Sequence, residues 1–128
     1  MESGVIKEII SKLLEHSERL LDEYGEFYPF SFVRNLDKSV VLLNVYSGQD
    51  YPNATEHLEQ LESKLQEEYS TYGIAINSLI KNELQESMSI ILIKLCIEGQ
   101  DYEDSYVPYN LKSGLVELGD LTTFSDPS

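Results

Sequence analysis

The order of hydrophobic periodicities along the chain constrains the fold more than any other feature. Residues 5–24 and 53–72 carry apolar side chains at the steps of three, four and seven that are typical of amphipathic helices. Gly25 and Gly73 directly follow these segments, and glycine favours a helix end because it enters the left-handed conformation without a Cβ clash. Runs of β-branched and aromatic residues follow each segment, which predicts helices packed on strands.

The strand-like runs are short and are separated by polar turn residues. Residues 30–34 and 40–46 predict a β-hairpin, and residues 74–80, 89–97 and 102–109 predict a meander. Residues 114–118 could add a short edge strand, and we expect an irregular tail from about residue 119. The 128 residues suit a single domain, residues 1–128.

The predicted class is therefore α+β, in the order helix-strand-strand-helix-strand-strand-strand. Because hairpins dominate the strand connections, we expect an antiparallel sheet of about five strands with both amphipathic helices on one face. Such an arrangement would leave the other face open, since successive side chains of a strand point to opposite faces.

Strand alternation places apolar side chains on that second face, which predicts an interface. Self-association as a homodimer is one explanation and a foreign partner is another. The C-terminal segment folding across the face is a third. The candidate dimer face comprises Val40, Leu42, Tyr46, Ile90 and Leu92.

The formal charge of the chain is −14, from 9 basic and 23 acidic residues. A negative field of this size disfavours nucleic acids and anionic membranes and favours encounter with a basic protein. Acidic side chains concentrate in the second helical segment and in the turn near residue 101. The candidate partner-binding residues are Glu59, Glu62, Asp101 and Asp104.

Residues capable of chemistry show no catalytic or metal-binding spacing, so we expect a non-enzymatic protein without cofactor or metal. Cys96 is the only cysteine and lies inside an apolar run, which predicts a buried thiol. His16 and His57 lack paired-ligand spacing, and we expect both on the surface. A small hydrolase stays open as an alternative, because 23 carboxylates could supply an unrecognised pair.

The first residues lack the layout of a signal peptide, and no stretch approaches the ~20 apolar residues of a membrane span. We therefore expect a cytoplasmic protein.

Two short motifs carry a family resemblance: Glu-Phe-Tyr-Pro-Phe at 26–30 and Val-Pro-Tyr at 107–109. With them the chain resembles small bacterial α+β proteins, some of which are immunity proteins found beside contact-dependent toxins. The element order is also similar to the roadblock and profilin-like topology, which implies a dimerising scaffold. The leading hypothesis is a bacterial protein-binding domain of the immunity type that neutralises a basic toxin, and the alternative is a homodimeric adaptor.

Overall fold

The computed structural model describes residues 2–43, 54–81, 84–99, 103–112 and 115–123. It confirms the α+β class. The helices are α1 (Glu2–Tyr24) and α2 (Ala54–Glu68). The strands are β1 (Phe30–Arg34), β2 (Val40–Leu43), β3 (Tyr72–Lys81), β4 (Ser87–Cys96), β5 (Glu103–Lys112), β6 (Leu115–Leu118) and β7 (Thr122–Thr123).

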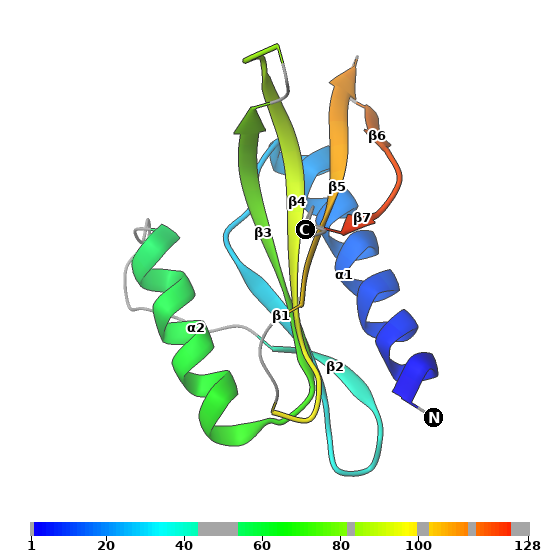
Figure 1. Ribbon diagram of the computed structural model, residues 1–128, viewed down its shortest axis with the longest axis vertical. Coiled ribbons are helices and arrows are strands. Elements are labelled where there is room, and N and C mark those ends of the chain that lie inside the picture. Colours follow the sequence, from blue (N-terminus) through cyan, green and yellow to red (C-terminus); the bar gives the residue numbers. More distant parts are fainter. Residues whose placement is uncertain (1, 44–53, 82–83, 100–102, 113–114, 124–128) are drawn as a thin grey trace.

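The strands form one curled antiparallel sheet in the order β2-β1-β3-β4-β5-β6, with β7 beside β5 (Figure 1). The long pair β3–β4 occupies the centre, with a register that runs from Tyr72 opposite Cys96 to Lys81 opposite Ser87. The sheet therefore has more strands than the about five that the sequence predicts, because β6 and β7 both add to the outer edge of β5.

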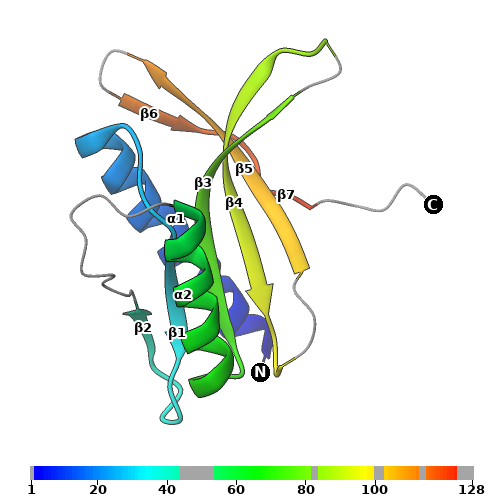
Figure 2. The same cartoon turned by 90° about the vertical axis from the view of Figure 1, so that its left-hand side faces the viewer.

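The two helices cover opposite faces of this sheet, so the expectation that both lie on one face is wrong (Figure 2). On one face α1 packs Ile9 and Leu13 against Ile91 and Ile93 of β4. The residues that join α2 to the other face are all buried and come from four elements. They are Leu61 and Leu65 of α2, Val33 of β1, Tyr72 and Ile74 of β3, and Cys96 of β4.

The strand directions explain this arrangement. Both β2 and β3 pair antiparallel with β1, so they run in the same direction on either side of it. Parallel strands cannot be joined by a tight hairpin and need a crossover, which is usually helical. The α2 segment makes that crossover above β1, and it does so on the face that α1 leaves uncovered. The part of the second face around β1 and the first residues of β3 is therefore covered by α2.

Gly25 and Gly73 have different roles, although the sequence predicts a helix end at both. Gly25 has a φ of 77° and its amide donates to the Leu21 carbonyl at 2.9 Å, which confirms the predicted end of α1. Gly73 instead lies inside β3. A Cβ there would come within 2.7 Å of Ile9 Cγ2 and 2.8 Å of Leu13 Cδ1, so glycine is required where α1 crosses the strand.

The C-terminal strands extend the sheet and do not fold across its second face. In β6 the side chains of Val116 and Leu118 join the core under α1. Between β6 and β7 the register against β5 shifts by one residue, which marks a β-bulge. The extra residue lies in the segment 119–121, opposite Pro108, whose carbonyl accepts from Gly119 at 2.7 Å but which has no amide hydrogen to donate in return. The tail expected to be irregular from about residue 119 thus contains the short strand β7.

Candidate functional site

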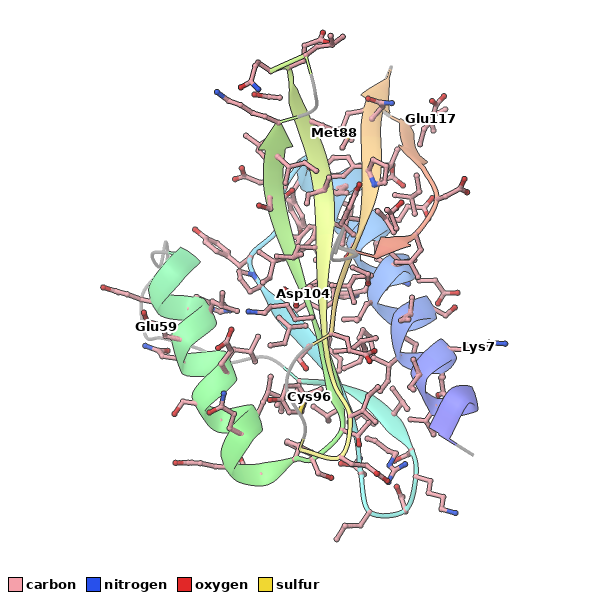
Figure 3. All side chains as sticks on the ribbon, in the orientation of Figure 1. Lys7, Glu59, Met88, Cys96, Asp104 and Glu117 are labelled. Atoms are coloured by element: carbon pink, nitrogen blue, oxygen red, sulfur yellow. The ribbon has the colours of Figure 1, made fainter. Side chains whose placement is uncertain are left out.

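Two of the four predicted acidic residues lie beside one lysine on the α2 face of the sheet, and a third lies on α2 itself. Glu59 is exposed on the outer side of α2 (Figure 3). Glu62 forms an ion pair with Lys94 of β4, with 3.7 Å between Lys94 Nζ and Glu62 Oε1. Asp104 of β5 is exposed and lies directly opposite Lys94 in the strand register. Asp101 lies outside the described residues.

Further acidic side chains extend this region along α2. A shallow depression on the helix is lined by Glu59, Gln60, Ser63, Lys64, Glu67 and Glu68. Its cation, Lys64, already pairs with Glu68 at 3.2 Å. We call Glu59, Glu62, Glu67, Glu68 and Asp104 the acidic surface. The two lysines within it, Lys64 and Lys94, each pair with one of its carboxylates.

The residues of the predicted dimer face do not form one surface. Val40 is 8% exposed and belongs to the core under α1, and Leu42 follows on the same side of β2 with 45% exposure. Ile90 and Leu92 point to the opposite face of the sheet, where Ile90 is 1% exposed. Tyr46 lies outside the described residues. Alternation within one strand shows which residues lie on the same side of that strand. Only the pairing between strands shows on which face of the sheet that side lies.

The prediction that both histidines lie on the surface is wrong for His57. His57 is buried, not solvated, and its Nε2 lies 3.0 Å from the Pro29 carbonyl oxygen. It stands four residues before Leu61, which stands four before Leu65, so all three share the buried side of α2. That spacing of four residues is the sequence signal from which the burial of His57 could have been predicted. His16 is half-buried, and burial lowers its pKa, with the Arg19 charge adding to the effect.

Cys96 is buried, as its position in an apolar run predicts, and its Sγ lies 3.7 Å from the Ser70 carbonyl oxygen. Within the described ranges, no group of three or more His, Cys, Asp or Glu side chains is arranged to hold a metal ion.

A second candidate site lies where the sheet divides into two arms. The β4–β5 pairing ends at Ile90 opposite Pro108, after which β4 pairs only with β3 and β5 only with β6 among the described residues. The β3–β4 and β5–β6 hairpins consequently diverge beyond this point (Figure 2). The cleft between them has a volume of about 320 Å³ and is lined by Glu86, Ser87, Met88, Ser89, Tyr109, Asn110 and Leu111. We call it the inter-arm cleft.

Tyr109 is the central side chain of this region. Its hydroxyl donates to Asn77 Oδ1 at 2.7 Å across the sheet. Burial raises the pKa of Tyr109, the nearby Glu26 carboxylate raises it further, and a hydrogen bond with Ser89 opposes them. Tyr109 also lines a neighbouring hollow of about 380 Å³, formed where the end of α1 at Gly25 and Glu26 meets β3.

The groups in these two hollows are suited to binding. Asn77, Ser89 and Tyr109 offer hydrogen-bonding groups, while Leu79 and Leu111 flank them with 66% and 49% of their surface exposed. Apolar walls with a few convergent polar groups are the usual composition of a ligand site. The site was not predicted from the sequence, although the alternation of Ser87 and Ser89 with Met88 and Ile90 marks a strand with one polar side.

Across the described parts of the chain, no helix combines the length and the apolar character needed to cross a membrane. Comparison with protein-family models, curated proteins and solved structures found no match to this chain.

Proposed function

We propose that this chain is a non-enzymatic domain that binds a basic protein through its acidic surface. The observation that carries the proposal is the position of the carboxylates: Glu59 and Glu67 stand exposed on α2, and Asp104 stands exposed on β5, on the α2 face of the sheet. They belong to different elements that the fold brings to one side. With a net charge of −14 behind them, they favour rapid encounter with a positively charged surface.

The lysines of the acidic surface support this reading. Lys94 pairs with Glu62 of α2 and lies opposite Asp104 of β5, so it offsets only part of the negative charge and leaves the outer carboxylates in excess. Rim charges of this type act mainly on the association rate and on specificity. An immunity-type protein that neutralises a basic toxin is the most concrete form of this function.

The test is the rate at which the chain associates with the basic product of a gene adjacent to its own. The variant Glu59→Lys with Glu67→Lys should lower the association rate by about tenfold or more at low salt, and should flatten its salt dependence. The matched control is Glu15→Lys with Glu23→Lys on α1, which changes the net charge equally at exposed positions on the opposite face.

Stopped-flow measurements between about 20 and 500 mM NaCl separate the outcomes, because salt screens exposed charges within a Debye length. A larger effect of the α2 pair than of the α1 pair supports the acidic surface. Equal effects would show that only net charge matters. A rate independent of salt would refute the electrostatic proposal.

A further inference from the structure

The inter-arm cleft is bordered by two strand edges that face each other. The carbonyl of Pro108 accepts from Gly119, so the backbone groups of Pro108 point away from β4. Backbone groups alternate between the two sides of a strand, and those of Tyr109 and Leu111 must therefore point toward β4. The same alternation from the Ile90–Pro108 pair directs the backbone groups of Ser87 and Ser89 toward β5.

The outer side of each edge is already engaged within the sheet. Ser87, Met88 and Ser89 lie opposite β3, and Tyr109 to Lys112 lie opposite β6. In the described part of the sheet, no strand pair joins Ser87 to Leu111 across the cleft. Such an edge is a template for another strand, and here two of them border one space.

We propose that the inter-arm cleft takes an extended segment of the basic protein partner, which adds as a strand between β4 and β5. Neighbouring strands lie ~4.8 Å apart, so one inserted strand would bridge edges ~10 Å apart. Main-chain hydrogen bonds to both edges would supply affinity, and alternate side chains would supply specificity. This inference rests on the proposed function, because it assumes the same protein partner.

The side chains around the cleft indicate what the segment carries. On the α1 face an inserted strand would place alternate side chains beside Tyr109 and Leu111, and Leu111 is 49% exposed. An apolar side chain fits there. Glu26 is exposed at the neighbouring hollow and raises the pKa of Tyr109, so its negative charge reaches this position. A basic side chain two positions further along the inserted strand lies on the same face and would complement this charge.

The experiment selects binders to the intact chain from a random heptapeptide library displayed on phage, with the Leu111→Pro variant used for counter-selection. Proline at 111 removes an amide that faces the cleft, whereas Asn110 and Lys112 keep their pairs with Glu117 and Leu115 of β6. We expect selected peptides that carry an apolar and a basic residue two positions apart, so that both side chains lie on the α1 face. In ¹⁵N-labelled protein they should shift the amide signals of Ser87, Ser89 and Leu111.

A synthetic copy of the strongest binder gives the quantitative test. Methylation of its alternate backbone nitrogens should weaken binding by about tenfold or more, since it removes several of the hydrogen bonds that pair the peptide with the strand edges. Leu111→Pro should weaken binding more than Leu111→Ala, which keeps the amide. Should Leu111→Pro not fold, the methylated peptide against the unaltered chain carries the same test.

Three results would overturn the inference: no binder selected, unchanged affinity after methylation, or amide shifts confined to other elements. A dimer in sedimentation that is lost in Leu111→Pro would identify a second copy of the chain as the occupant, and would overturn it too. The Glu59→Lys, Glu67→Lys variant changes the acidic surface but no residue that lines the cleft, so the two proposals can fail independently. If the partner still binds with a salt-sensitive rate while no peptide enters the cleft, the cleft alone is refuted.

Discussion

At the scale of single residues, the contact of α1 with β3 depends on the absence of a side chain at Gly73. Ile9 and Leu13 are both fully buried there, and each would lie within 3 Å of an added Cβ. The Ile9 methyl concerned is held directly on its Cβ, and a β-branched side chain in a helix has little freedom to turn away. The core therefore has no room for even one carbon at this point.

Gly73→Ala should consequently lower the free energy of unfolding by about 1–3 kcal/mol, the usual cost of overpacking a core. Urea denaturation followed by circular dichroism measures it. Gly4→Ala is the matched control, because a Cβ at Gly4 in α1 meets nothing within 4 Å. It should gain about 0.5–1 kcal/mol, since alanine is the better helix former. Equal effects of the two substitutions would contradict the packing of α1 on β3.

At the scale of elements, α2 decides how much of the second sheet face stays open. It covers β1 and the first half of β3 through Leu61 and Leu65, and Glu62 ties it to Lys94 of β4. The ion pair is about a quarter exposed on both sides and contributes little on its own, since such pairs are typically worth below about 1 kcal/mol. Burial of the two leucines therefore holds the helix in place.

Leu61→Ala tests this packing. Removing a fully buried leucine leaves a cavity and should cost about 2–5 kcal/mol of unfolding free energy. Ser63→Ala on the exposed side of the same helix should change it by less than about 0.5 kcal/mol. Urea denaturation of both variants gives the comparison. A small change in Leu61→Ala would mean that α2 is not docked on the sheet.

At the scale of the whole molecule, the negative charge is distributed over both helices and the strand connections. Both helices lack a basic residue in the last turn, and 23 acidic residues share the surface with 9 basic ones. Self-repulsion of this kind destabilises a compact state, because unfolding moves the charges apart. A surface under such repulsion is also one that a basic partner would stabilise on binding.

Moderate salt should therefore stabilise the free chain. Raising NaCl from about 20 to 300 mM shortens the Debye length from roughly 20 Å to below 10 Å and screens the repulsion. The urea midpoint should rise over this range, and it should rise less in the Glu59→Lys, Glu67→Lys variant, whose net charge is less negative. A midpoint that falls with added salt would show that attractive ion pairs outweigh the repulsion.

Most of the local structure follows from patterns in the sequence. The helical period of residues 5–24 and the end at Gly25 follow from contacts within a few residues, and both are found in the structure. The strand runs and the buried Cys96 follow from the same local patterns. Local periodicity predicts these elements because a helix can bury an apolar stripe, and a strand an apolar side, only if its own residue spacing places apolar side chains there.

The face of the sheet on which each helix and each strand side lies depends on the tertiary fold. The β2–α2–β3 crossover sends α2 to the face opposite α1, which buries His57 and separates Val40 and Leu42 from Ile90 and Leu92. The role of Gly73 depends on Ile9 and Leu13 of α1, which lie 64 and 60 residues earlier in the chain. The acidic residues around Lys94 and the cleft beside Tyr109 likewise join elements distant in sequence. All of these spatial relations depend on pairing between strands that are distant in sequence, and the local periodicity of a segment does not specify that pairing.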